Sequence, residues 1–436
     1  MHVPAIAVLL LVVQSPIRLD SAEVARVLAQ LRTSDSTVCE LAGQTLANYG
    51  GFWGGGGGGA RDYLNAGMPM PRPMPTPMPM PGGGGGGGMA GIMRGVMHGN
   101  MGHRSGSDAA TLGAFRAVLR DDNRCIRNIA ARVLGNHGPT GTYELFIGLL
   151  RDAKPGLRET GAIGLGELED SRAIGPLGDA LGDAEVYVRA RAAWALGEIE
   201  EEAAIDPLGR ALRDRAPEVR RIAAWALGQI ESARAVRPLG DALNDASLDV
   251  RLTAAWALGE IEDASAVPLL ATAAKDREPR VRQAAAWALG EIESAQGVAP
   301  LSPLVRDPAI EVRKAAIWAL GEIEAGSGVA PAAVGLKDAD PDVRVLAAWA
   351  LGEIEDESGV EPLVAALKDP DIDVRVSAAW ALGEIESSLA LEGLKAAQQD
   401  ASASVRRAAT WALRQIDDDD NPRVRVHVRP RVRIKS

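Results

Sequence analysis

The stretch AAWALGEIE, at Ala192–Glu200, returns in nearly identical form every 31 residues and decides the fold. Its tryptophan marks the copies, and no insertion or deletion separates them. The positions are Trp194, Trp225, Trp256, Trp287, Trp318, Trp349, Trp380 and Trp411. A fixed period of this length is typical of stacked repeat proteins, in which each repeat contacts only its neighbours. The sequence therefore predicts one stack of repeats in place of several globular domains.

Each copy contains the pattern of two amphipathic helices. At 100° per residue, the segment Val188–Glu200 gathers its apolar residues on one face. That face consists of Val188, Ala192, Ala195, Leu196 and Ile199. The preceding segment, Ala173–Leu181, predicts a shorter helix with Pro176 in its first turn, where a missing N–H costs nothing. Neither helix can bury its apolar face alone. We therefore predict an all-α fold, a right-handed α-solenoid of about eleven stacked helical hairpins.

A glycine lies inside the second helix of the regular copies. It stands at Gly197, Gly228, Gly259, Gly290, Gly321, Gly352 and Gly383. A glycine within a helix costs about 1 kcal/mol relative to alanine. Repetition of that cost predicts that another helix approaches closely at this point. The last copy has Arg414 instead, which fits a terminal repeat with nothing stacked beyond it.

Aspartate and arginine form a second regular series, with the arginine six residues after the aspartate. The series includes Asp183 and Arg189, Asp214 and Arg220, Asp245 and Arg251, and Asp276 and Arg282, and it continues to Asp400 and Arg406. The aspartate falls at the turn between the helices, and the arginine in the first turn of the second helix. Because a guanidinium fork can bridge the turns of adjacent repeats, the series predicts a structural ladder.

Composition divides the chain into five expected segments. They are 1–20, a signal peptide or apolar N-terminal segment; 21–50, a degenerate first repeat; 51–107, a Gly-, Met- and Pro-rich disordered insertion; 108–417, the repeat solenoid; and 418–436, an acidic and then basic tail. The apolar run Val3–Val13 has the length of a signal peptide and is too short to span a bilayer. It predicts an exported, periplasmic protein; the alternative is an uncleaved segment that caps the first repeat of a cytoplasmic one.

Charge indicates the kind of partner. The formal net charge is −11, which argues against nucleic acid and favours a cationic protein or peptide. Only the N-terminal apolar segment or the basic tail would contact a membrane. In the tail, Arg alternates with Val at the period of a strand, and it could also fold back onto the repeats. We expect a monomer.

The tryptophan column predicts a binding surface. It lies about 150° from the centre of the apolar face at 100° per residue, and shares a face with the residue four positions later. Those residues are Glu198, Gln229, Glu260, Glu291, Glu322, Glu353, Glu384 and Gln415. A concave groove with a Trp floor and a Glu edge would suit a cationic extended peptide. In the alternative, the indoles pack against neighbouring repeats. Specificity then comes from the variable positions Ala190, Arg221, Leu252, Gln283, Lys314, Val345, Val376 and Arg407.

Two further groups of side chains suggest local chemistry. Cys39 and Cys125 would form a disulfide if their helices stack across the insertion; otherwise they are two separate thiols. In the insertion, Met89, Met93, Met97 and Met101 are spaced by four residues near His98. Thioether and imidazole ligands suit Cu(I), but such biased tracts are usually compositional, and a flexible linker explains the cluster without any metal.

The unit D-x-x-x-x-V-R-x-x-A-A-x-A-L-G-E-I-E, followed by A-V-x-P-L, resembles the HEAT-like repeat of the phycobilisome-lyase type. The resemblance covers about Asp108–Asp417, with a weaker copy at Ser21–Tyr49. It implies a HEAT-like solenoid, a fold that serves scaffolds, chromophore lyases and metal hydroxylases alike.

Deoxyhypusine hydroxylases of this fold bind two irons through His–Glu pairs. In this chain the five histidines, His2, His98, His103, His137 and His427, are never followed by Glu. We therefore expect a non-catalytic interaction scaffold without a cofactor. The alternative is a phycobilin-lyase-like or hydroxylase-like enzyme.

Overall fold

The computed structural model describes residues 24, 26, 28–29, 109–138 and 141–419. This part of the chain contains twenty α-helices, α4 to α23, joined by turns and short 3-10 helices, and it contains no strand. The predicted all-α solenoid is confirmed. The chain divides into two compact units, one whose described repeats end at Ile230 and one that begins at Glu231. Ten helical hairpins are described; most of the predicted eleventh, in 21–50, lies outside the described residues.

The first unit contains four helical hairpins. Their helices are α4 (Ala109–Ala117), α5 (Arg124–His137), α6 (Thr142–Leu150), α7 (Pro155–Leu168), α8 (Ile174–Ala180), α9 (Val186–Glu198), α10 (Ile205–Ala211) and α11 (Pro217–Gln229). The 3-10 helices η1 (Ser171–Ala173) and η2 (Glu202–Ala204) precede α8 and α10. The helix predicted for Val188–Glu200 is α9, which ends at Glu198, two residues before the predicted end. Val24 and Leu28, in the helix predicted for Ser21–Leu31, are helical and buried.

The second unit contains six hairpins. Their helices are α12 (Val236–Ala242), α13 (Leu248–Glu260), α14 (Val267–Ala273), α15 (Pro279–Glu291), α16 (Val298–Leu301), α17 (Ile310–Glu322), α18 (Val329–Gly335), α19 (Pro341–Ile354), α20 (Val360–Ala366), α21 (Ile372–Glu384), α22 (Leu391–Ala397) and α23 (Ala403–Asp419). The 3-10 helices are η3 (Ala233–Ala235), η4 (Ala264–Ala266), η5 (Ala295–Gly297), η6 (Leu304–Arg306), η7 (Gly326–Gly328), η8 (Glu357–Gly359) and η9 (Ser388–Ala390).

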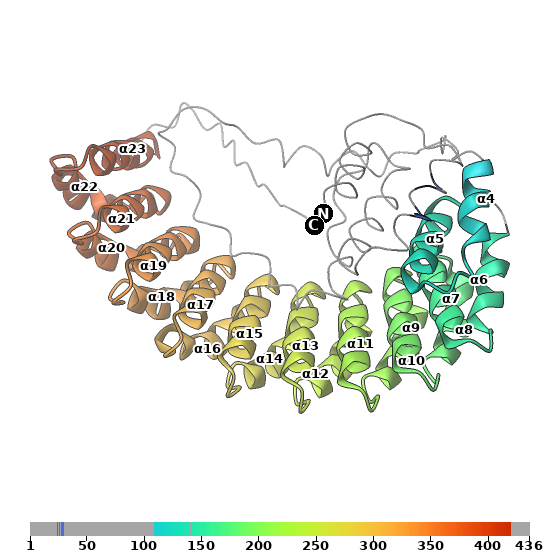
Figure 1. Cartoon of the computed structure of the whole chain (residues 1–436). Helices are drawn as coiled ribbons and strands as arrows, with labels where there is room; N and C mark the ends of the chain where they lie inside the picture. Colours follow the sequence, from blue (N-terminus) through green and yellow to red (C-terminus); the bar gives the residue numbers. More distant parts are fainter. Residues whose placement is uncertain (1–23, 25, 27, 30–108, 139–140, 420–436) are drawn as a thin grey trace, which may run out of the picture. The chain divides into compact units, whose positions relative to one another are not determined.

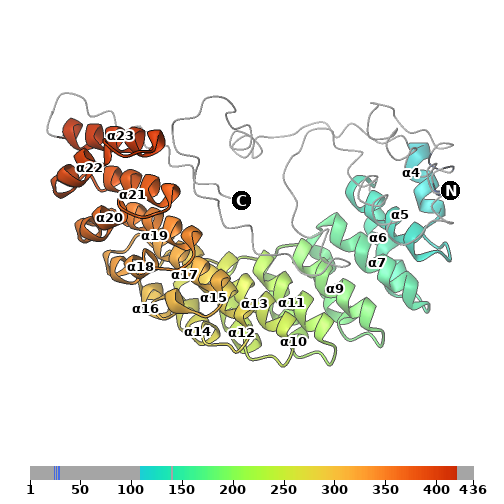
Figure 2. The same cartoon turned by 60° about the vertical axis from the view of Figure 1, so that its left-hand side comes forward.

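Within each unit, the second helices of the hairpins pack against one another in chain order. In the second unit, α13, α15, α17, α19, α21 and α23 lie side by side in this order (Figures 1 and 2). Each first helix covers the second helix of its own hairpin. The apolar face predicted from the repeat is the core: Val188, Ala192, Ala195 and Leu196 are completely buried. A second helix inside the stack is therefore covered on both flanks and on one further side.

The glycine column marks the closest approach between second helices, as predicted. A β-carbon on Gly197 would lie 2.8 Å from the Ala226 Cβ and 2.9 Å from the Trp225 Cζ3. The same relationship recurs in the second unit, where Gly290 would meet Trp318 Cζ3 at 2.8 Å. Real Cβ atoms do not come this close to neighbours, so only glycine fits at this point in the stack. Arg414, which replaces the glycine in α23, is exposed.

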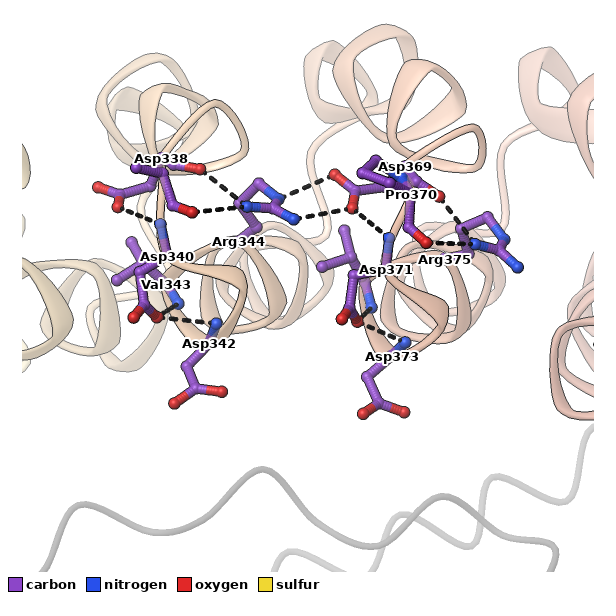
Figure 3. A network of polar contacts seen from close by, with 12 residues as sticks. Asp338, Asp340, Asp342, Val343, Arg344, Asp369, Pro370, Asp371, Asp373 and Arg375 are labelled. Atoms are coloured by element: carbon purple, nitrogen blue, oxygen red, sulfur yellow. Dashed lines mark hydrogen bonds and ion pairs between the residues drawn. The ribbon is translucent and has the colours of Figure 1, made fainter.

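The Asp–Arg ladder connects successive repeats, also as predicted. Arg344 Nε and Nη2 donate to the two carboxylate oxygens of Asp369 in the next repeat, at 2.9 and 3.0 Å (Figure 3). Its Nη1 donates to the backbone carbonyl of Asp338, six residues earlier, at 2.9 Å. Arg189 binds Asp214 and the Asp183 carbonyl in the same way. Arg344 and Arg189 thus fix their own turns to the next ones, which is a structural role.

Candidate functional site

The tryptophan side chains lie between repeats. Trp194, Trp225, Trp287 and Trp318 are only 3–4% exposed. Trp256, Trp349, Trp380 and Trp411 are half-buried. Within each unit, the ring edges of the indoles lie against the glycine of the preceding repeat, as in Gly197 with Trp225 and Gly290 with Trp318. The alternative interpretation, that the indoles pack against neighbouring repeats, therefore holds for the four most buried tryptophans, because the flank of a second helix is covered by its neighbour. The two cation–π contacts among the described residues involve Tyr187 and Tyr143.

The glutamates four residues after each tryptophan lie at the C-terminal ends of the second helices. Glu198, Glu260, Glu291, Glu322, Glu353 and Glu384 are all half-buried. Glu322 is the last residue of α17, and Glu384 is the last residue of α21. The carbonyl end of a helix carries a partial negative charge, so a carboxylate there is unfavourable. The repeat places a negative group where the local electrostatics disfavour it.

A second glutamate follows two residues later and adopts the left-handed conformation. Its backbone φ is between 49° and 53° in eight repeats. These residues are Glu169, Glu200, Glu231, Glu262, Glu293, Glu324, Glu355 and Glu386. Helices that end in this way usually have glycine at this position, because a side chain costs energy there. The sequence analysis missed this second row, since a glutamate gives no signal of a left-handed residue.

We define the carboxylate edge as the pairs of glutamates at the ends of the second helices in the second unit. The pairs are Glu260 and Glu262, Glu291 and Glu293, Glu322 and Glu324, Glu353 and Glu355, and Glu384 and Glu386. In each pair the first side chain is half-buried and the second is exposed. The segments 260–267, 291–298, 322–329, 353–360 and 384–391 contain no Lys or Arg. These segments therefore contribute only negative charge to the edge.

Burial and mutual repulsion raise the pKa values along this edge. Burial, with the charges of Glu291, Glu353, Glu293 and Glu324, raises the pKa of Glu322 to about 7. Burial and the neighbouring glutamates also raise the pKa of Glu353 to about 7, although a hydrogen bond from Trp349 opposes this. The pKa of Glu384 is raised in the same direction. Carboxylates that share a low-dielectric strip bind protons that a cation could replace.

The other predicted site residues lie elsewhere. Cys125 is disulfide-bonded. Cys39, the one other cysteine of the chain, lies outside the described residues. Met89, Met93, Met97, Met101 and His98 also lie outside them, so the copper prediction stays a prediction. Within the described residues, no cluster of His, Cys, Asp and Glu is arranged to hold a metal. No helix in that part of the chain is long and apolar enough to cross a membrane.

Comparison with known families defines the class of repeat. Models of HEAT repeats match residues 113–186, 174–249, 236–321, 284–334 and 329–414. The chain belongs to the HEAT-repeat family, as its resemblance implied. No curated protein matches it.

Solved structures share the solenoid fold. Importin β aligns with a TM-score of 0.52 at 16% identity, over 71% of this chain and 51% of its own. Kap95p in complex with RanGDP aligns with a TM-score of 0.50 at 16% identity, over 70% of this chain and 50% of its own. A complex of CpcE and CpcF of phycocyanin lyase from a Nostoc species is 24% identical over 56% of this chain and 94% of its own, with a TM-score of 0.32. At these identities the first two similarities show the fold alone.

Proposed function

We propose that this protein is a non-catalytic scaffold that binds a cationic segment of a protein partner along the carboxylate edge. The observation that carries the proposal is the second row of glutamates in the left-handed conformation. A non-glycine residue in this conformation costs about 1–2 kcal/mol. The repeat pays a further electrostatic penalty at each helix C-terminus. Positions that break local rules in every repeat are expected where function requires them.

A cationic ligand would offset the electrostatic repulsion among the glutamates of the carboxylate edge. Among the described residues, no cation contributes to the raised pKa values of Glu322 and Glu384, which lie two repeats apart in the same row. Lysine and arginine side chains of an extended segment could reach several pairs at once. Binding would lower the raised pKa values and release protons, so affinity should increase as the pH rises through about 7. Kap95p, which binds RanGDP on a similar fold, supports a protein partner in general.

A labelled peptide with the sequence of residues 423–436 is a suitable cationic probe, since it contains six Lys or Arg side chains. We expect it to bind the full chain in a fluorescence anisotropy titration, and to bind less tightly as salt is added. The triple variant Glu322→Gln/Glu353→Gln/Glu384→Gln should lose about tenfold in affinity, because three weak ion pairs sum to about 1.5 kcal/mol. Glutamine is compatible with this column, because Gln229 and Gln415 occupy it.

A second triple variant, which removes three charges outside the carboxylate edge, distinguishes binding at the edge from a general effect of net charge. Glu311, Glu361 and Asp373 are exposed and lie outside the carboxylate edge. Their replacement by Gln, Gln and Asn removes the same number of charges and should leave the affinity nearly unchanged. Equal losses in the two triple variants would show that binding is nonspecific, and the proposed site would then be wrong. A chain that ends at Asp420 tests whether the tail competes in cis.

We further propose that the protein acts in an oxidising compartment. The disulfide at Cys125 supports this, because such bonds are rare in the cytosol. The apolar run Val3–Val13 is consistent with export. In protein taken from its native cells, Cys125 should resist alkylation until a reductant is added. Direct alkylation of Cys125 would favour the cytoplasmic alternative.

A further inference from the structure

The first unit contains a cluster of charged side chains that the regular repeats lack. It lies on the adjacent second helices α5, α7 and α9. Glu159 occupies the column that holds Ala190 one repeat later, and Arg132 occupies the tryptophan column. Arg191 occupies a column that holds Thr160 in the preceding repeat and Thr253 further along the chain. Two departures from the repeat, Arg132 and Arg191, therefore lie on the same three neighbouring helices as Glu159, the carboxylate of a variable column.

Glu159 is the centre of this cluster and is completely buried. Arg124 Nε donates to Glu159 Oε2 at 2.9 Å, and Arg124 Nη2 donates to Oε1 at 2.5 Å. From the opposite side, Arg191 Nε lies 3.5 Å from the same Oε1. One carboxylate thus faces two guanidinium groups, and its short hydrogen bonds come from Arg124.

Around Arg191, cations outnumber carboxylates. Arg124 and Arg132 repel its charge, whereas Glu159 attracts it. Glu167 lies 3.7 Å from Arg132 and accepts a hydrogen bond from Asn136 at 2.8 Å. Burial lowers the pKa of Arg191 to about 10, and the charges of Arg132 and Arg124 add to the effect of burial, while Glu159 opposes it. The Arg191 guanidinium therefore lacks enough negative charge around it.

Two polar atoms of the cluster are buried without a hydrogen-bond partner. They are Nη1 of Arg191 and Oδ1 of Asn128. The Arg191 side chain is only 11% exposed. A buried donor without an acceptor costs about 1–3 kcal/mol, and more when it is charged. Asn128 lies on α5 between Arg124 and Arg132 in sequence, and its amide can present either an acceptor or a donor after a half-turn.

We propose that this cluster is a binding site for an oxyanion, the carboxylate or phosphate group of a ligand, with Arg191 Nη1 as its main donor. An oxyanion supplies both the missing negative charge and the missing acceptor. The Arg124 side chain is 59% exposed and connects the cluster to the surface. This site is opposite in charge to the carboxylate edge and lies in the other unit, so the two proposals succeed or fail independently.

The variant Arg191→Thr tests the site with little risk to the fold, because Thr160 and Thr253 are accommodated at the equivalent positions. The probes are inorganic phosphate and acetate, titrated into the full chain at constant ionic strength with chloride as the balancing ion. Calorimetry or the shift of arginine Nε–H NMR signals reports binding. We expect at least one probe to bind the wild type, and Arg191→Thr to weaken it about tenfold or more, the loss of one charged hydrogen bond. The probe that binds more tightly shows whether the site prefers a phosphate or a carboxylate group.

A matched control removes one charge elsewhere in the same unit. Arg210 is exposed on α10, and Arg210→Ala should bind the probe like the wild type. Failure of both probes to bind, or equal affinity in the wild type and Arg191→Thr, would overturn the proposal. If Arg191→Thr does not fold, Glu159→Gln decides: removal of the competing carboxylate should raise the affinity several-fold, and an unchanged or lower affinity would contradict the site.

Discussion

Gly321 and Trp349 are complementary in shape: a β-carbon on Gly321 would lie 2.7 Å from Cζ3 of Trp349 in the next repeat. The indole ring fills the space that the missing side chain leaves. The pair therefore acts as one packing element, in which the bulk of the tryptophan requires the absence of bulk on its neighbour. This explains why a glycine that weakens the helix recurs beside the largest side chain of the repeat.

Gly321→Ala should lower the free energy of unfolding of the second unit by about 1–3 kcal/mol, because overpacking must displace the indole. The change opposes helix propensity, which alone would add about 1 kcal/mol. Urea denaturation monitored by circular dichroism measures it.

Gly148→Ala provides the control. Gly148 lies within α6, and a β-carbon there would meet nothing within 4 Å. This variant should gain about 0.5–1 kcal/mol from propensity alone. If both alanine variants are stabilised, the close approach at Gly321 does not affect the free energy of unfolding, and the packing argument is wrong.

The sequence was a reliable guide wherever a residue acts within the period. The helical face around Leu196, the close approach at Gly197 and the ladder that begins at Asp183 all followed from spacing, because each repeats the same local contact. The burial of Trp318 followed only as one of two alternatives, because the helical wheel by itself places the tryptophan away from the core. A helical wheel treats a helix as an isolated cylinder, whereas a stacked helix also buries its flanks.

Two other features were beyond sequence analysis for different reasons. The left-handed conformation of Glu324 has no signal, because the residue that usually marks it is glycine. The orphan donor of Arg191 depends on which side chains surround Glu159, and sequence spacing does not give hydrogen-bond geometry.

Arg313→Met should destabilise the second unit by about 3 kcal/mol, since it leaves a largely buried carboxylate without its partner. Arg313 Nε and Nη2 donate to Asp338 at 2.7 and 3.0 Å, and the two side chains are only 16% and 11% exposed. Thermal unfolding measures the loss. Lys337→Met removes an exposed cation beside Asp338 and should change the stability little; equal losses would refute the ladder's role.

Arg313→Met should also change how the stability of the second unit depends on pH in the acidic range. Burial alone would raise the pKa of Asp338, but hydrogen bonds from Arg313 and the Asp340 backbone outweigh burial and hold it below its usual value. A lowered carboxyl pKa contributes stability above the pKa of the unfolded chain, and this contribution is lost as the pH falls through the folded value. Arg313→Met should therefore lose less stability than the wild type when the pH falls below about 4.

Glu322→Gln should reduce the pH dependence of stability near neutral pH. Because the pKa of Glu322 is raised from 4.5 to about 7, its contribution is fully present below about 4.5 and is lost as the pH rises through about 7. The neutral glutamine lacks this loss. Melting temperatures at about pH 5 and pH 8 should show that the variant exceeds the wild type only at the higher pH. Glu361→Gln, on an exposed face, should follow the wild type at both values.

Glu355→Gly separates stability from binding. The backbone φ of Glu355 is 51°, a conformation that glycine adopts without strain. The variant should gain about 0.5–1 kcal/mol of stability and lose affinity for the 423–436 peptide. Glu361→Gly, within α20, should instead lose about 1 kcal/mol and keep the affinity. Unchanged peptide binding by Glu355→Gly would remove the second row of glutamates from the proposed site.

The equal spacing of the carboxylate pairs has a consequence for how a partner would exchange. The edge presents five nearly equivalent pairs, from Glu260 and Glu262 to Glu384 and Glu386. A ligand that covers three of them has three registers of similar energy, worth about 0.6 kcal/mol of statistical entropy. It could move by one repeat without full dissociation, because only one pair is released at each step. A periodic edge would then act as a track along which a bound segment diffuses, with no single register fixed by the repeats.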